Sequence, residues 1–136
     1  MKILSLVSVL SLFIFASSCK KDNNSQTDPN QDLARTVRFT LYTDKDFSND
    51  DENIDFNVFI QTGSSQPIWD SSFSTMKVKN IPSLLNKIVV EKTITGYGSS
   101  LLKVGFRYTL PGVGDSWYYD ADSPGQAMKE VTFNFQ

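Results

Sequence analysis

From about residue 36 to the end of the chain, apolar and polar residues alternate in short segments. In the segment 102–110, for example, every second residue is a large apolar or aromatic one, and the intervening positions are polar or glycine. A period of two places the apolar side chains on one face of an extended strand. The pattern predicts about seven strands, at residues 36–42, 54–61, 73–79, 87–93, 102–110, 117–120 and 131–135.

Turn residues separate these segments, and no segment has a convincing helical period. Short alternating strands over about 100 residues are typical of two packed antiparallel sheets. We therefore predict an all-β fold, an antiparallel β-sandwich of the immunoglobulin-like or a related type, over residues 35–136. Residues 68–70 are a candidate extra edge strand, and residues 82–86 are a candidate helical turn. Phe59 falls out of the alternation in its strand, so we expect it to be exposed or covered by a loop.

The first part of the chain has a different pattern. A basic start at Lys2 is followed by an apolar run at 3–15, which is about 13 residues long, whereas a bilayer core needs about 20. The run is therefore typical of a secretory signal that is removed from the mature protein. Small residues at 16–18 then lead directly to Cys19.

Small residues followed by a cysteine resemble the lipobox of bacterial lipoproteins, although Ala16 stands where leucine is usual. The resemblance implies that Cys19 is lipidated and becomes the new N-terminus once residues 1–18 have been removed. Two or more acyl chains hold a protein stably on a membrane. The polar segment after Cys19 has little apolar surface to bury, which predicts a flexible tether. We thus expect a lipid anchor and tether at 19–34 and one folded domain at 35–136.

The residues directly after Cys19 are Lys20, Lys21 and Asp22. They resemble the start of lipoproteins from Bacteroidota-type bacteria, in many of which a lysine followed by acidic residues marks export to the outer face of the outer membrane. Asn23 departs from that pattern, since a second acidic residue is expected there. The resemblance implies a lipid-anchored protein of the outer membrane that faces the cell surface, with the periplasmic face as the alternative.

The order of the predicted strands also sorts the loops between them. If each connection reverses the direction of the chain, loops fall alternately at the two ends of the sandwich. One end then gathers loops 62–72, 95–100 and 121–126 together with the tether, and the other gathers loops 44–53, 80–86 and 111–115. We therefore expect loop 44–53 to point away from the membrane.

The composition excludes several kinds of chemistry. The chain has no histidine and a single cysteine, which removes the commonest general base, the usual zinc ligand and any internal disulfide. The net charge is −2 and no basic cluster occurs, so we expect no nucleic-acid partner. Carboxylates stand at Asp70, Glu91, Asp120 and Asp122, but nothing marks a catalytic pair, so we do not expect an enzyme.

One loop is strongly acidic. Its carboxylates are Asp44, Asp46, Asp50, Asp51 and Glu52. Calcium takes six to eight oxygen ligands from carboxylates, amides and carbonyls, so this loop is a candidate calcium site, although its spacing is not that of an EF-hand. The other interpretation is a solvated loop in which Asp and Asn side chains stabilise turns. Calcium is the one cofactor that the sequence suggests, and both interpretations stay open.

Four aromatic residues near strand ends or in loops are candidates for ligand binding, namely Trp69, Tyr97, Trp117 and Tyr118. Flat aromatic side chains stack on sugar rings and on partner side chains, and Trp and Tyr are enriched at binding hot spots. Alternation places Trp117 and Tyr119 on one face of their strand and Tyr118 on the other. The other interpretation is that Trp69 and Trp117 close the ends of the core, because tryptophan is mostly buried.

Together these patterns predict a membrane-anchored envelope lipoprotein with a non-catalytic binding sandwich, whose ligand is a glycan or a protein. The alternative is a structural accessory subunit of a larger envelope assembly, with calcium as a candidate stabilising ion. An accessory subunit would expose a broad apolar strip, larger than a monomer normally shows, and Phe59 and Val89 are the residues at which we expect it.

Overall fold

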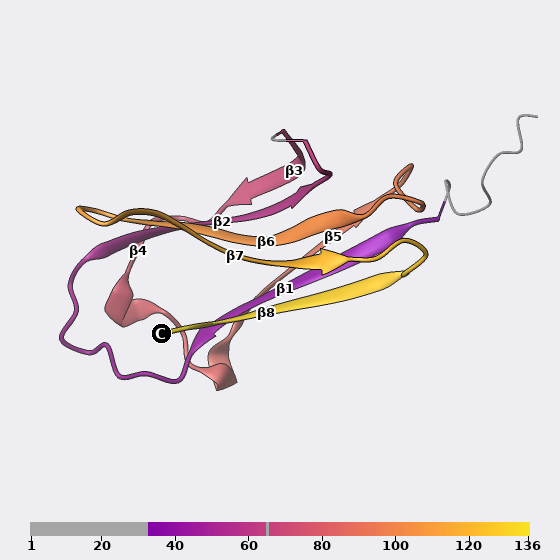
Figure 1. Ribbon diagram of the computed structural model, residues 1–136. Helices are drawn as coiled ribbons and strands as arrows, with labels where there is room; N and C mark the ends of the chain where they lie inside the picture. Colours follow the sequence, from indigo (N-terminus) through magenta and orange to yellow (C-terminus); the bar gives the residue numbers. More distant parts are fainter. Residues whose placement is uncertain (1–32, 65) are drawn as a thin grey trace, which may run out of the picture.

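The structure is a computed structural model that describes residues 33–64 and 66–136 (Figure 1). The predicted signal at 1–18, Cys19 and all but the last two residues of the predicted tether lie outside the described residues. In the described part of the chain, no helix is long and apolar enough to cross a membrane. The strands are β1 (Arg35–Thr43), β2 (Asn53–Gln61), β3 (Pro67–Ser72), β4 (Met76–Lys77), β5 (Ile88–Ile94), β6 (Leu102–Leu110), β7 (Gly114–Asp122) and β8 (Met128–Phe135), and two 3₁₀ turns, η1 (Val78–Asn80) and η2 (Leu84–Asn86), precede β5.

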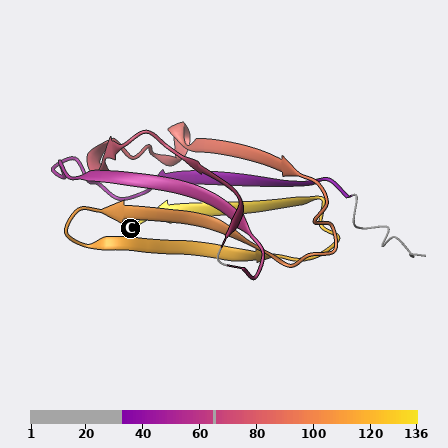
Figure 2. The ribbon, with the colours of Figure 1, turned by 90° about the horizontal axis from the view of Figure 1, so that it is seen from above.

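The strands form two layers, so the predicted all-β sandwich is confirmed. One layer is a five-stranded sheet in the order β3-β2-β6-β7, with β4 also paired to β2, and the other is a three-stranded sheet in the order β5-β1-β8. In both views the strands of the two layers run along the long axis of the molecule (Figures 1 and 2). The named strand pairs are antiparallel except β1 and β8, which pair in parallel from Thr36 and Met128 to Thr43 and Phe135. The pair is parallel because the chain crosses between the sheets after β7 and so enters β8 at the end where β1 begins.

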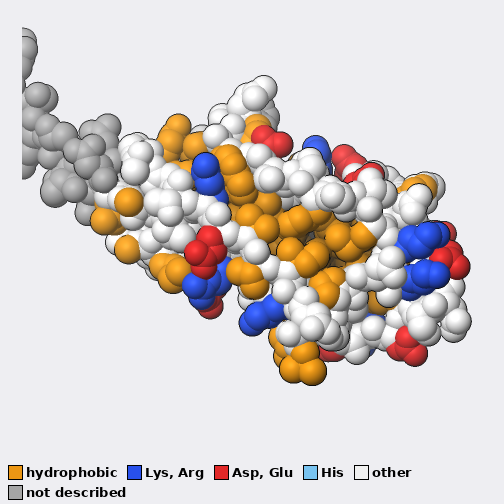
Figure 3. Space-filling view, turned by 180° about the vertical axis from the view of Figure 1, so that it is seen from behind, with side chains coloured by type: hydrophobic (Ala, Val, Ile, Leu, Met, Phe, Trp, Pro, Cys, Tyr) orange, Lys and Arg blue, Asp and Glu red, His pale blue; other side chains and the backbone are white. Residues whose placement is uncertain are grey.

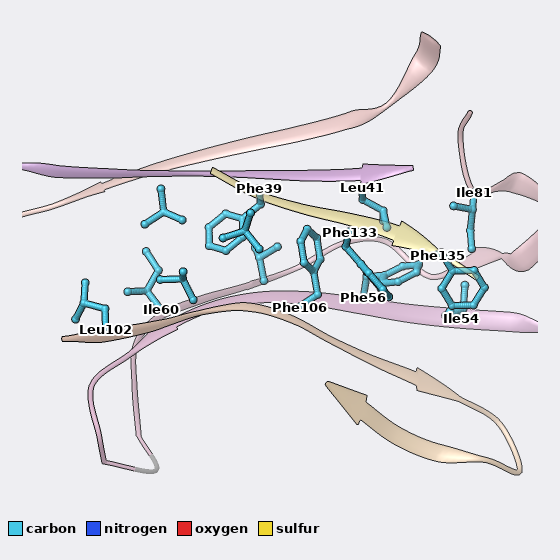
Figure 4. Close-up of a cluster of buried hydrophobic side chains, with 14 of the residues drawn as sticks. Phe39, Leu41, Ile54, Phe56, Ile60, Ile81, Leu102, Phe106, Phe133 and Phe135 are labelled. Carbon is cyan, nitrogen blue, oxygen red and sulfur yellow. The ribbon is translucent and has the colours of Figure 1, made fainter. Parts of the chain in front are cut away.

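The core lies between the layers and is rich in phenylalanine (Figure 4). Phe39 from β1 meets Phe106 from β6 edge to face, with ring centroids 5.8 Å apart. Phe56 from β2 meets Phe133 and Phe135 from β8 in the same way. Burying one such side chain contributes about 1.5–3 kcal/mol, so these contacts across the two layers hold the sandwich together.

The predicted strand boundaries need three corrections. Within the predicted strand 73–79 only Met76–Lys77 is extended, because the chain turns there to cross between the sheets, and Val78 N and Lys79 N donate instead to the carbonyls of the acidic loop. The candidate edge segment 68–70 is the centre of a full strand, β3. The predicted strand 117–120 extends over the whole of β7, since β7 pairs with β6 along its entire length. The predicted helical turn is found as η2.

The predicted sorting of the loops agrees with the strand directions. The acidic loop, the η1–η2 segment and the β6–β7 turn lie at the end where β1 finishes, and the β2–β3, β5–β6 and β7–β8 connections lie at the end where β1 begins (Figure 1). At the second end Gly125 N donates to Gly98 O across 2.9 Å, which joins two of these loops. The chain from residue 33 therefore enters the sandwich opposite the acidic loop.

A buried ion pair closes the end at which the chain enters. The side chains of Arg35 and Asp122 are 1% and 2% exposed, and their charged atoms lie 2.7 Å apart. The Arg35 guanidinium also donates to four backbone carbonyls, those of Tyr97, Ser100, Asp122 and Ser123. One arginine thus fixes two loops and the last residue of β7 to the first residue of β1.

Candidate ligand-binding face

The outer surface of the five-stranded sheet carries an aromatic and basic group of side chains, which we call the aromatic face. It consists of Phe59 on β2, Lys103 and Arg107 on β6, and Trp117 and Tyr119 on β7. These residues face outward because the alternate positions of each strand, such as Val58, Phe106 and Leu102, fill the core. Strand register places Arg107 opposite Trp117, and places Gly105 between Phe59 and Tyr119. Distant parts of the sequence therefore meet on one rigid sheet.

Gly105 allows this arrangement. A Cβ atom at this position would lie 2.6 Å from Tyr119 Cα and 2.7 Å from Tyr119 Cβ, and closer still to the carbonyl oxygen of Tyr118. Glycine within a strand commonly marks such a close approach of another backbone. The space that a side chain at position 105 would fill is taken up by the backbone and Cβ atom of Tyr119, so β7 packs closely on β6 at the centre of the face.

Trp117 is one of the two exposed aromatic side chains of the face. Its indole is 53% exposed, while Phe59 beneath it is 4% exposed. The two rings meet edge to face, with centroids 5.5 Å apart and an interplanar angle of 77°. Phe59 is thus buried on the outer surface of its sheet, and the side chain that contacts it comes from a strand and not from a loop. The Phe59 contact holds the exposed indole in place.

The two basic residues of the face lie over its aromatic rings. The Lys103 ammonium is 4.2 Å from the centroid of the Tyr119 ring, and the Arg107 guanidinium carbon is 5.6 Å from that of Trp117. Cations in these positions are attracted by the ring quadrupole. Among the described residues neither of them forms an ion pair. Their charges therefore remain available to a ligand.

Two neighbouring hollows follow the face along the strands. The first is lined by Asn57, Phe59, Gln61, Pro67, Asp70, Arg107 and Trp117. The second is lined by Gln61, Thr62, Gly63, Leu101, Leu102, Lys103, Tyr119, Asp120 and Ala121. Because Gln61 belongs to both, the hollows adjoin each other. Each combines an aromatic wall with amide and charged groups that can form hydrogen bonds, which is the usual composition of a ligand site.

The structure does not bring the four predicted aromatic residues together. Of these, only Trp117 lies on the aromatic face. Tyr118 points the other way and stacks on Phe133, with centroids 4.8 Å apart. Trp69 points inward from β3, and its ring centroid lies 6.1 Å from that of Phe39. The side chain is half-buried, which favours the interpretation that Trp69 belongs to the core. Tyr97 packs against the core in the loop that Arg35 holds.

Sequence reasoning missed the other members of the face, although the signals were present. Alternation placed Tyr119 beside Trp117, and Phe59 stood out as an apolar residue at a polar position. Lys103, Gly105 and Arg107 occupy alternate positions of one strand, which puts them on the face opposite the core. No pattern within a single strand could show that these three segments lie side by side, because the order of the strands in the sheet is set by long-range packing.

In the acidic loop, carboxylates stabilise the turns of the backbone. Asp46 Oδ1 accepts from Ser48 N at 2.9 Å, and Asp50 Oδ1 accepts from Glu52 N at 3.0 Å. The hydrogen bonds from Ser48 lower the pKa of Asp46. Such contacts two residues apart are the turns that the solvated-loop interpretation describes.

Two further carboxylates of the loop, those of Asp51 and Asp44, have other partners. Asp51 lies 2.6 Å from Lys79 Nζ and 3.3 Å from Lys77 Nζ, and the hydrogen bond from Lys79 is the main reason that its pKa is lowered. Asp44 accepts from Gln136 at 3.5 Å. Within residues 33–64 and 66–136, no three acidic, cysteine or histidine side chains are grouped so that they could hold a metal ion. These contacts favour the solvated loop, and the calcium site stays a prediction.

The fold and the face define a class only, an all-β sandwich with an aromatic and basic surface on its larger sheet. The chain matches no protein-family model, no curated protein and no solved structure.

Proposed function

We propose that this protein is a non-catalytic, glycan-binding lipoprotein of the cell envelope, anchored in the outer membrane through Cys19 and facing the cell surface. The observation that supports glycan binding is the pair of exposed aromatic rings, Trp117 and Tyr119, which are 53% and 54% exposed on one face of a rigid sheet. Exposed aromatic rings in such number are unusual unless they contact a ligand or a partner.

The chemistry of the face suits a sugar chain. A pyranose ring has an apolar face of C–H groups, which stacks on an aromatic ring, and a rim of hydroxyl groups, which needs hydrogen-bond partners. Asn57, Gln61 and Asp70 line the first hollow beside Trp117 and supply amide and carboxylate groups of this kind. Because Trp117 and Tyr119 are two residues apart on β7, their rings are spaced by about 7 Å along the strand. This arrangement fits an extended chain better than a single small molecule.

The position of the chain's entry agrees with this role. The described chain enters at the end closed by Arg35, and the aromatic face runs along the side of the sandwich from there. A flexible tether of about 15 residues has a reach of roughly 20 Å. A domain on such a tether is free to turn the side of its larger sheet towards material that surrounds the cell.

The ion-pair partners of the carboxylates support binding without catalysis. Of the four considered for acid–base chemistry, Asp122 is buried in its pair with Arg35, Glu91 pairs with Arg38, and Asp120 pairs with Lys129. The fourth, Asp70, lines the first hollow with Trp117. No other carboxylate lines that hollow. Hydrolysis of a glycosidic bond ordinarily needs two.

Removing the indole tests the proposal. The full chain, extracted in detergent, is screened against soluble polysaccharides immobilised in a native gel, and Trp117→Ala is compared with wild type. We expect Trp117→Ala to weaken binding at least tenfold, and Tyr42→Ala, which removes an aromatic ring from the outer surface of the other sheet, to leave binding unchanged. Equal binding by wild type and Trp117→Ala, or equal loss in the two variants, contradicts the proposal.

A specific observation also supports the accessory-subunit alternative. Phe59 is buried and Val89 stands among polar neighbours, so neither forms the expected strip. However, apolar side chains gather in a band over the open edge between β3 and β5 (Figure 3). The half-buried apolar residues of these edges and of the segment after β3 are Ile68, Trp69, Phe73, Met76, Ile88 and Val90. An accessory subunit predicts one discrete large complex when native membranes are solubilised and run in a native gel, whereas a binding module predicts the mass of the single chain.

A further inference from the structure

We infer that the glycan bound by the aromatic face is anionic, and that Lys103 and Arg107 bind its acidic groups. The inference rests on the proposed function, since it concerns the same face. It adds the chemical class of the ligand, a sugar chain that carries carboxylate or sulfate groups.

The pairing of the basic residues is the first reason. Elsewhere in the described chain, Arg35, Arg38, Lys77, Lys79 and Lys129 lie against carboxylates, Lys92 lies over the ring of Trp69, and Lys45 and Lys87 form no ion pair. Lys103 and Arg107 form no such pair among the described residues and lie instead against Tyr119 and Trp117. The rings restrict the two side chains without neutralising them. A cation that is already ordered loses less conformational entropy when it binds an anion.

The spacing of the two cations is the second reason. They stand four residues apart on β6, which is about 13 Å along the strand. Arg107 lines the first hollow and Lys103 lines the second, and the two hollows adjoin at Gln61. A single small anion cannot reach both positions, but a sugar chain with an acidic group on successive or alternate residues can. The aromatic rings on β7 run beside this line and face the sugar rings.

The carboxylates near the face do not cancel these charges. Asp120 lines the second hollow but is held by Lys129, and this hydrogen bond is the main reason that its pKa is lowered. Asp70 lies opposite Phe59 on β3 and lines the first hollow together with Arg107, but the two form no ion pair. From there it can accept hydrogen bonds from hydroxyl groups of a bound sugar while the acidic groups lie on β6.

Matched polymers test the inference. Binding of the detergent-extracted full chain is measured by bio-layer interferometry on carboxymethylcellulose against hydroxyethylcellulose, and on dextran sulfate against dextran. We expect at least one acidic polymer to bind tenfold or more tightly than its neutral counterpart, with an affinity that falls as salt is raised. The first pair tests carboxylate groups and the second tests sulfate groups.

Two double variants test whether Lys103 and Arg107 cause this preference. Lys103→Gln with Arg107→Gln should remove most of the preference for the acidic polymer. Lys45→Gln with Lys87→Gln removes the same charge from elsewhere on the surface and should preserve the preference. An equal loss in both double variants indicates attraction by overall charge and overturns the inference.

The outcomes also separate this inference from the proposed function. If neutral and acidic polymers bind alike and only Trp117→Ala weakens them, the face binds glycans and the anionic class is wrong. If neither acidic nor neutral polymers bind, the inference and the glycan-binding function both fail.

Discussion

The two sheets of the sandwich have outer surfaces of opposite character. On the three-stranded sheet, Arg38 is held between Glu91 on one neighbouring strand and Glu130 on the other, and Thr36 bonds to Thr93. On the five-stranded sheet, the basic residues lie against aromatic rings and the hydrogen-bonding groups border open hollows. A hollow also lies on the three-stranded sheet, but the Arg38, Glu91 and Glu130 side chains that line it are paired with one another, whereas Lys103 and Arg107 have no carboxylate partner among the described residues.

This difference shows that the outer surfaces of two sheets can have separate roles although the sheets share one core. Ion pairs across neighbouring strands, as around Arg38, contribute to sheet pairing and leave little for a ligand to gain. Exposed Trp and Tyr side chains are enriched at binding hot spots, so their presence on the outer surface indicates another role. The proposal that the five-stranded sheet binds a glycan rests on this contrast.

The largest expected effect comes from removing the ion pair on which both faces depend. Asp122→Ala leaves Arg35 buried without its carboxylate partner, and breaking such a pair costs about 3–5 kcal/mol. We expect a correspondingly large fall in the free energy of unfolding, measured by denaturant titration. Asp120→Ala, which removes an exposed carboxylate two residues away, is the control and should change stability far less.

The next largest effect comes from a substitution at the centre of the aromatic face. Gly105→Ala forces a Cβ atom against the backbone of Tyr118 and Tyr119, so β7 must shift, at a cost of about 1–3 kcal/mol. Glycan binding should fall with it, because Trp117 and Tyr119 both lie on β7. Gly63→Ala meets no atom within 4 Å and should alter stability by less than about 0.5 kcal/mol. If Gly105→Ala proves as stable as wild type, β7 does not lie as close to β6 as the structure shows.

A pair of matched arginine variants sharpens the contrast in function. Arg38→Gln and Arg107→Gln each remove one guanidinium from an outer surface. We expect Arg38→Gln to lower the melting temperature slightly, more so at low salt, and to leave binding of the polymer intact. Arg107→Gln should weaken binding of an acidic polymer and barely move the melting temperature. The reverse assignment would place the ligand on the three-stranded sheet.

The smallest effect concerns the stability of the fold at acidic pH. The pKa of Asp51 is lowered in the folded protein by Lys79 and Lys77, so its carboxylate stabilises the fold above its unfolded pKa of about 3.9. That contribution is lost as the pH falls through the lower, folded pKa. Melting temperatures followed from pH 7 to pH 2 should therefore drop below about pH 4, and Asp51→Asn should show a shallower drop. An identical acid profile for the variant would show that the lysines do not hold this carboxylate.

Much of the fold follows from the sequence because alternation reports directly which side of a strand is buried. Residues 37–41, 54–60 and 102–110 have the alternation that the core requires, with Phe39, Phe56 and Phe106 at its centre. The parallel pairing of β1 and β8 left no local trace, since it depends on where the chain crosses between sheets. The sequence predicted a strand over 73–79, but only Met76–Lys77 pairs with β2, and the backbone of Val78 and Lys79 bonds to the acidic loop.

The candidate site was only partly predictable. Trp117 was identified from its residue type, and its outward direction followed from the alternation of β7. The contributions of Arg107 and Phe59 depend on the order of three strands in the sheet, and the close packing of β7 on β6 depends on the glycine at position 105. Trp69 has the same residue type as Trp117 but points inward, because β3 faces the core at that position.

The two tryptophans provide the most direct test of the central claim that the aromatic face is where the ligand binds. In a ¹⁵N-labelled full chain, each indole N–H gives its own NMR signal, assigned with Trp69→Phe and Trp117→Phe. On titration with the tightest-binding polysaccharide, the Trp117 signal should shift or broaden while the Trp69 signal stays in place. A shift confined to Trp69, or to Tyr42, Val89 and Glu91 on the opposite surface, would contradict the account.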